Sequence, residues 1–155
     1  MSLIHGTCVS FPLIEEDGLC AAVLLRGPSG SGKSDLALRL IDDGAMLVAD
    51  DQVEVLRQNG KLIAKAPQQK PQVTLGLLEV RGVGLVRLPS VPQAKLVGII
   101  DLGSRAGIER LPDNQTAEVS DVALPLWQLD AFDASAMAKV GVIVALAAGR
   151  TELVT

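Results

Sequence analysis

The stretch QVEVLRQNGKLIAK, residues 52–65, decides the fold class of this chain. Apolar and polar side chains alternate over Gln52–Gln58, as they do in a half-buried strand. Asn59-Gly60 separates this run from the strand-like Lys61–Lys65, and Asn-Gly between two such runs is the strongest short-range signal of a hairpin. The stretch therefore predicts two antiparallel strands.

The residues before this hairpin predict a strand, a helix and a second strand. Leu19–Arg26 is a continuous apolar run typical of a buried strand, and Met46–Ala49 is a shorter one. Between them, Lys33–Asp43 has apolar residues at helical spacing, and Gly44 is a natural stop for that helix. The apolar face of the helix consists of Leu36, Ala37, Leu40 and Ile41.

The residues after the hairpin contain more strands than helices. We expect strands over Leu77–Val80, Val83–Leu88 and Lys95–Leu102, a second helix over Ala134–Ala148, and loops over 66–76 and 103–123. A doubly wound domain would alternate strand and helix throughout. The chain instead predicts a single α/β domain, residues 1–155, with a mixed, partly antiparallel sheet.

Composition and charge exclude several classes of function. A net charge of −4 without a dense run of Lys or Arg disfavours nucleic-acid binding. No apolar stretch reaches the roughly 18 residues that span a bilayer, and the N-terminus does not resemble a secretory signal. Cys8 and Cys20 are therefore expected to be reduced thiols. We expect a cytoplasmic protein without a membrane partner.

The most specific motif is a complete phosphate-binding loop, or P-loop. Its glycines allow backbone N–H groups to turn toward phosphate oxygens, and the following helix adds the partial positive charge of its N-terminus. The lysine can reach the terminal phosphates and the last serine can bind Mg²⁺. A glycine-rich turn that binds nothing is the alternative, which the flanking strand and helix disfavour. The motif is Gly27-Pro28-Ser29-Gly30-Ser31-Gly32-Lys33-Ser34.

Asp50-Asp51 follows the strand that comes after the P-loop helix. Ligands of open α/β sheets collect at the carboxyl ends of strands, so both carboxylates are expected near a bound nucleotide. One can hold a metal ion through water while the other accepts a proton from the acceptor hydroxyl. The spacing does not say which does which. The alternative is a solvated pair of turn residues.

Four other residues are weaker candidates by themselves. Glu79 and Arg81 would share one face of a short strand, where they could bind a metal ion and a phosphate or form an ordinary surface pair. His5, the single histidine, and Arg110, in a loop-rich segment, would each be unremarkable surface residues without further information.

The order of these motifs resembles the catalytic domain of bacterial HPr kinase/phosphorylase. The resemblance runs from His5 to about Leu111, and its specific parts are Val48-Ala49-Asp50-Asp51 and Leu78-Glu79-Val80-Arg81-Gly82-Val83-Gly84. It implies a fold akin to the nucleotide domain of phosphoenolpyruvate carboxykinase. The length suggests a short form that lacks the N-terminal domain of this family.

That family transfers phosphate from a nucleotide to a serine of HPr, a carrier protein of the sugar phosphotransferase system. The resemblance implies that Lys33 binds phosphate, that Asp51 is the base, and that His5 and Arg110 are additional catalytic residues. It also implies that Ser34 and Glu79 bind Mg²⁺, which leaves Asp50 as a further metal ligand. We therefore expect ATP and Mg²⁺ as cofactors, an HPr-like carrier as the partner, and a homohexamer.

The last third of the chain departs from the family pattern. Many members also remove the phosphate with inorganic phosphate, and a loop containing Pro and Arg is associated with that reaction. Here no Lys or Arg occurs from Leu111 to Ala138, so we expect weak phosphorylase activity. Two alternatives remain: a kinase for a small metabolite, and a nucleotide-binding regulator that transfers no phosphate.

Overall fold

The structure, a computed structural model, describes residues 1–67 and 75–154. Two α-helices and one short 3₁₀ turn accompany the strands of a large sheet and a separate hairpin in this part of the chain. The elements in chain order are β1 (Ser2–His5), β2 (Thr7–Ile14), β3 (Cys20–Arg26), α1 (Lys33–Asp42), β4 (Met46–Ala49), β5 (Gln52–Gln58), β6 (Lys61–Lys65), β7 (Leu77–Val80), β8 (Gly84–Arg87), β9 (Gln93–Leu102), η2 (Arg105–Gly107), β10 (Gln115–Val119), β11 (Val122–Leu129) and α2 (Ala136–Ala147).

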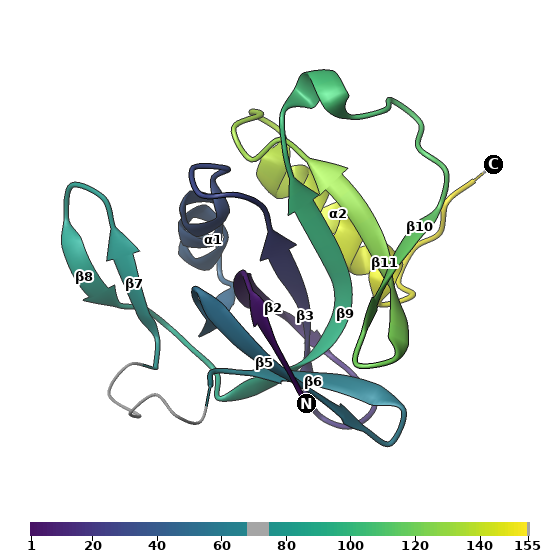
Figure 1. Ribbon diagram of the computed structural model, residues 1–155, viewed down its shortest axis with the longest axis horizontal. Coiled ribbons are helices and arrows are strands. Elements are labelled where there is room, and N and C mark those ends of the chain that lie inside the picture. Colours follow the sequence, from purple (N-terminus) through teal and green to yellow (C-terminus); the bar gives the residue numbers. More distant parts are fainter. Residues whose placement is uncertain (68–74, 155) are drawn as a thin grey trace.

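The large sheet is mixed, as the sequence predicts. Its strand order is β1-β5-β6-β9-β3-β2-β4, and β11 joins the end of β9 with β10 at its outer side. The pairs β3–β9 and β9–β11 are parallel, and all other pairs in this sheet are antiparallel. Figure 1 shows β3 and β9 at the centre of the molecule. The predicted 52–65 hairpin is β5–β6, and Asn59 and Gly60 at its turn both have positive φ.

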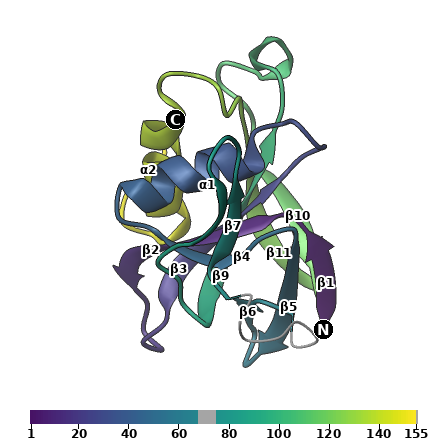
Figure 2. The same ribbon diagram turned by 90° about the vertical axis from the view of Figure 1, so that its left-hand side faces the viewer.

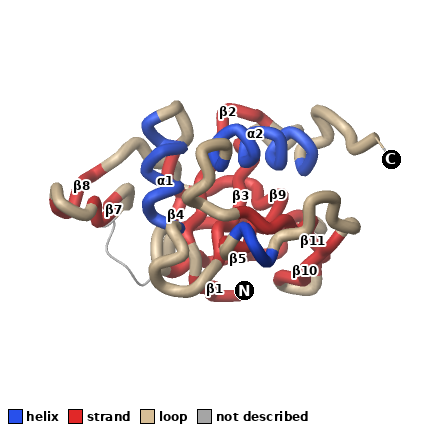
Figure 3. The backbone as a smooth tube through the Cα atoms, turned by 90° about the horizontal axis from the view of Figure 1, so that it is seen from above, coloured by secondary structure: helices blue, strands red, loops and turns tan. Residues whose placement is uncertain are grey.

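Two hydrophobic cores lie on the two faces of the sheet. The first packs α1 and α2 against the central strands, and it buries the predicted helix face of Leu36, Ala37, Leu40 and Ile41. Figure 3 shows α1 and α2 as neighbouring helices beside the strands. The second core is enclosed by the opposite face, where Leu24, Val55 and Ile99 meet Leu124 from β11. These apolar interfaces hold the carboxyl ends of β3, β4, β9 and β11 in place.

The N-terminal strands and the β10–β11 hairpin were not predicted from the sequence. The expected loop 103–123 is wrong in part, because β10 and the start of β11 lie within it. Their two-residue turn uses Ser120 and Asp121, both with positive φ, and Ser-Asp is a weaker hairpin signal than Asn-Gly. Most of the other expected loop, residues 68–74, lies outside the described residues.

The β7–β8 hairpin forms its own two-stranded sheet and projects from the body of the molecule (Figure 1). Figure 2 shows this hairpin in front of α1, on the outer side of the helix. It is anchored by Leu78, whose side chain is buried in the first core. In the described part of the chain, no helix combines the length and the apolar character needed to cross a membrane.

Candidate active site

The P-loop connects β3 to α1 with a backbone that only glycine tolerates at several positions. Gly27, Gly30 and Gly32 have φ values of 154°, 84° and 97°. A Cβ atom at Gly27 would lie 2.5 Å from the hydroxyl oxygen of Ser31, and one at Gly32 would lie 2.8 Å from the Cβ atom of Ala131. The glycines therefore serve both the turn and its close packing against neighbouring loops.

Two side chains of the P-loop fit a phosphate ligand. The Ser31 hydroxyl is buried and makes no hydrogen bond within the described residues, although buried polar groups are normally paired. The Lys33 ammonium donates to the carbonyl oxygens of Gly27 at 2.5 Å and Pro28 at 3.0 Å. Both groups therefore lie inside the loop, where an anion would give the serine a partner and the lysine a counter-charge.

Asp50 connects the P-loop helix to the N-terminal strand β2. One oxygen of its carboxylate, Oδ1, accepts hydrogen bonds from Thr7 Oγ1 at 2.8 Å and from Ser34 Oγ at 3.4 Å. Its place directly after β4 follows from the buried strand that precedes it. A hydroxyl and a carboxylate at this separation suit Mg²⁺, which commonly takes one or two protein ligands and completes its shell with water and phosphate.

Asp51 faces a different neighbour. Its Oδ1 lies 3.5 Å from Nδ1 of His5, and the side chains of His5 and Asp51 are 61% and 69% exposed. Asp51 has a φ of 71°, in the left-handed region, and its carbonyl oxygen accepts a hydrogen bond from the Gly6 N–H at 3.0 Å. The bent backbone thus directs two adjacent carboxylates to two different partners, one toward Ser34 and one toward His5.

Glu79, Arg81 and Arg110 lie apart from these contacts. Glu79 is exposed on β7, and Arg81 lies in the turn after that strand. The expectation that these two residues share a strand face is wrong, because β7 ends at Val80 and the chain turns at Gly82. Arg110 is exposed in the segment between η2 and β10.

The metal-binding groups are likewise dispersed. Within residues 1–67 and 75–154, no set of three His, Cys, Asp or Glu side chains could hold a metal ion by itself. The structure therefore brings together Ser34 with Asp50 and His5 with Asp51, and it leaves Glu79 and Arg110 outside both groups.

Comparison with known proteins identifies the family. A family model described as the HPr serine kinase C-terminal domain matches residues 3–149, nearly the whole chain. The chain belongs to this family. It is 45% identical to the HPr kinase/phosphorylase of Clostridium tetani over 103 residues, which are 63% of this chain and 30% of that protein. It is 38% identical to the HPr kinase/phosphorylase of Clostridium beijerinckii, with the same coverage.

The chain spans less than a third of the length of these HPr kinase/phosphorylase relatives. A solved structure, the Hpr(Ser) kinase/phosphatase from Coxiella burnetii, has the same fold. Its TM-score is 0.74 at 22% sequence identity, and the match covers 93% of this chain and 94% of that one. The similarity in sequence thus supports the family, and the similarity in structure supports the mixed α/β fold of this chain.

Sequence reasoning missed three residues that shape the site. Thr7 is one, because nothing in the sequence connects it to Asp50. The other two are Arg26 and Asp101, which lie opposite each other on β3 and β9 and form two hydrogen bonds, of 2.7 and 3.0 Å. The hydrogen bond to Asp101 raises the pKa of Arg26. Arg26 is a charged residue at the end of an otherwise apolar strand, and this position could have indicated that it pairs with an acidic residue on a neighbouring strand.

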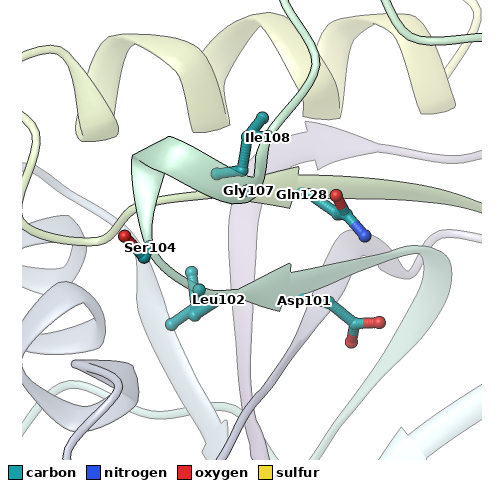
Figure 4. A pocket seen from close by; sticks show the side chains of 7 residues that line it. Asp101, Leu102, Ser104, Gly107, Ile108 and Gln128 are labelled. Carbon is teal, nitrogen blue, oxygen red and sulfur yellow. The ribbon is translucent and has the colours of Figure 1, made fainter.

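A cavity of about 230 Å³ lies beside this ion pair. Figure 4 shows Leu102, Ser104 and Ile108 around the cavity, with the polar ends of Asp101 and Gln128 turned to the same side. The carbonyl oxygen of Leu102 lies 3.1 Å from the position of a Cβ atom at Gly27. The cavity therefore borders the start of the P-loop, on the side away from Asp50.

Proposed function

We propose that this chain is an ATP-dependent protein-serine kinase that phosphorylates a serine of HPr or of an HPr-like phosphocarrier. The observation that carries the proposal is the arrangement around Asp50-Asp51. One carboxylate is bonded to the Ser34 hydroxyl of the P-loop, and its neighbour is exposed beside His5. Membership of the HPr serine kinase C-terminal domain family and the names of its relatives support the same function.

The residues divide the work as follows. The P-loop N–H groups and Lys33 hold the phosphates of ATP, and Arg110 offsets negative charge on the transferred group. Ser34 and Asp50, with Glu79, would hold Mg²⁺, which would neutralise phosphate charge. Glu79 would approach from the hairpin that Leu78 anchors beside α1.

Asp51 accepts the proton of the acceptor serine hydroxyl. The serine oxygen forms a bond to the γ-phosphorus while the bond from that phosphorus to the β,γ-bridging oxygen breaks, and ADP leaves with the electron pair of that bond. His5 orients the Asp51 carboxylate from 3.5 Å. We also propose the phosphoenolpyruvate-carboxykinase-like subclass for the fold, a mixed sheet with the P-loop helix packed on it.

The exposure of Asp51 favours a protein acceptor over a small metabolite. A kinase for a small molecule usually encloses its acceptor in a cleft that buries most of the ligand surface. Here the proposed base and His5 are both more than half exposed at the surface. A protein that presents its serine on a protruding segment could reach them without a deep pocket.

Labelled transfer tests this function directly. The purified chain is incubated with ATP labelled at the γ-phosphate, Mg²⁺ and purified HPr, and in parallel with a cell extract. We expect label on a small protein, and none when Lys33→Ala replaces the wild type. Label on a metabolite would support the small-molecule kinase, and nucleotide binding without any transfer would support the regulator. Unchanged transfer by a folded Lys33→Ala variant would contradict the P-loop assignment.

A further inference from the structure

Four strands of the sheet run in the same direction and end at the same edge. Neighbours β3, β9 and β11 are parallel, and β4 runs the same way because β2 is antiparallel to both β3 and β4. The P-loop follows β3 in the middle of this edge. Asp50 follows β4, two strands away on one side, and the loop 130–135 follows β11, two strands away on the other.

The order of Asp50, the P-loop and the loop 130–135 along this edge indicates how a bound nucleotide would be oriented. If the proposed function is right, the γ-phosphate lies toward Asp50 and Asp51, because transfer takes place there. The nucleoside is at the opposite end of the triphosphate and must leave the P-loop in the other direction, toward β9 and β11. The inference rests on the proposed function for this step.

An exposed aromatic side chain occupies that side. Phe132 in the β11–α2 loop is 67% exposed, and its Cζ atom lies 3.0 Å from the position of a Cβ atom at Gly32. The chain has only two Phe, one Trp and no Tyr, so an aromatic ring left in solvent is uncommon here. Folding alone would favour burying such a ring. Its exposure next to the P-loop therefore suggests that the ring contacts a ligand.

The loop that carries Phe132 is held by several contacts. Asp130 accepts the Phe132 N–H at 2.9 Å with Oδ1 and the Arg105 N–H at 3.1 Å with Oδ2. Arg39 of α1 donates to the carbonyl oxygen of Ala131. The two N–H groups, that of Phe132 above all, also lower the pKa of Asp130. The backbone that carries the ring is therefore tied to both η2 and the P-loop helix, so little order has to be created when a ligand binds.

We propose that Phe132 is the stacking surface for the nucleobase of the bound nucleotide. An exposed ring presents a π-face to a planar base, and such stacking tolerates any base. The cavity at Leu102 and Ile108 is the competing location, since it also lies on the β9 side of the P-loop. Phe132 is favoured because its ring lies against Gly32, the P-loop residue directly before α1, whereas the cavity borders the first glycine of the loop.

Calorimetry with two ligands tests the assignment. ATP and inorganic tripolyphosphate, each with Mg²⁺, share the phosphates that the P-loop binds, but only ATP has a base. Phe132→Ala should weaken ATP binding roughly 5- to 150-fold, the range for losing one stacked base, and should leave tripolyphosphate binding unchanged. Phe132→Trp should keep the affinity for ATP. Val142→Ala, which removes an exposed apolar side chain from α2, is the matched control and should change neither.

The outcomes separate this inference from the proposed function. An equal loss of both ligands in Phe132→Ala would mean that Phe132 merely supports Gly32, and unchanged ATP binding would mean that the base lies elsewhere. Either result would overturn the stacking role while leaving the kinase proposal intact. Weaker ATP binding in Ile108→Ala but not in Phe132→Ala would place the base in the cavity. A wild-type chain that binds neither ligand would refute the proposed function and the stacking role together.

Discussion

Asp50 and Asp51 are adjacent in sequence, yet the fold gives them different surroundings. The Asp50 carboxylate is engaged by two hydroxyl groups, those of Thr7 and Ser34. The Asp51 carboxylate is open to solvent beside His5. A group that must take a proton from an incoming protein needs access, so the geometry supports Asp51 as the base and Asp50 as the metal-side carboxylate.

Paired substitutions test this division. Asp51→Asn keeps the shape of the side chain but removes its ability to accept a proton, so turnover should fall about 10²-fold or more while ATP binding stays near the wild-type value. Asp50→Asn should instead raise the Mg²⁺ concentration needed for half-maximal rate. Steady-state kinetics with a magnesium titration measures both effects. An inactive Asp50→Asn next to a fully active Asp51→Asn would reverse the assignment.

The two cysteines should differ in reactivity. Burial raises the pKa of the Cys8 thiol to about 12 from an ordinary value of 9.0, whereas Cys20 is only partly buried. At pH 8 a thiol reagent should therefore label Cys20 of the native protein, and Cys8 only after unfolding. Mass spectrometry of the labelled chain identifies the site, and rapid labelling of native Cys8 would contradict its burial.

The same shift gives a pH dependence with a definite sign. Below about pH 9 the Cys8 thiol is protonated in both the folded and unfolded chain, so it contributes no slope to stability. As the pH rises above that value, the unfolded chain releases a proton that the folded chain retains, and the free energy of unfolding falls. Cys8→Ala should remove this part of the alkaline destabilisation, as measured by urea unfolding at pH 8 and pH 10.

At the scale of elements, the β11–α2 loop bears on the reverse reaction. It carries Asp130 and Asp133, and the nearby cations Arg105 and Lys139 already pair with Asp133. Inorganic phosphate beside a phosphoserine needs cationic or N–H donors, because the two anions repel each other. We therefore expect phosphorylase activity far below kinase activity. Rapid release of unmodified carrier with millimolar phosphate, Mg²⁺ and no nucleotide would contradict this expectation.

The β7–β8 hairpin depends on one buried side chain for its place beside α1. Leu78 is 1% exposed in the first core, whereas Leu85 on the partner strand is 68% exposed. Leu78→Ala should lower the free energy of unfolding by about 2–5 kcal/mol, the usual range for a buried leucine replaced by alanine. Leu85→Ala, the matched control, should change it by less than about 0.5 kcal/mol. Equal effects in urea unfolding would argue against the anchoring role of Leu78.

At the scale of the whole molecule, we expect a homo-oligomer, and the family resemblance suggests a hexamer. Large apolar side chains remain exposed on the projecting hairpin, at Val83 and Leu85, and in the segment after η2, at Leu111. Side chains of this kind are buried when subunits associate. Light scattering at micromolar concentration should give a mass several times 16.2 kDa. A monomer under these conditions would contradict the expectation.

Much of the fold could be predicted because its signals are local. The apolar run of β3, the periodic face of α1 and the Asn-Gly turn of β5–β6 each depend on residues within a few positions of one another. The hairpin of β10 and β11 was missed because Ser120-Asp121 lacks a glycine, although both residues adopt positive φ. A turn can therefore be predicted from the local sequence only where the residue types themselves favour its backbone conformation, as Asn-Gly does.

By itself, the sequence determined the glycine-rich loop after β3, the helix that follows it and the two carboxylates after the next strand. Only the tertiary structure decided which groups meet: Thr7 with Asp50, Arg26 with Asp101, and Phe132 with Gly32. These residues are far apart in the chain, and they meet because strand order and register place their backbones side by side. The register of the strands depends on which whole faces of the sheet are buried. A short sequence motif could therefore not predict these contacts.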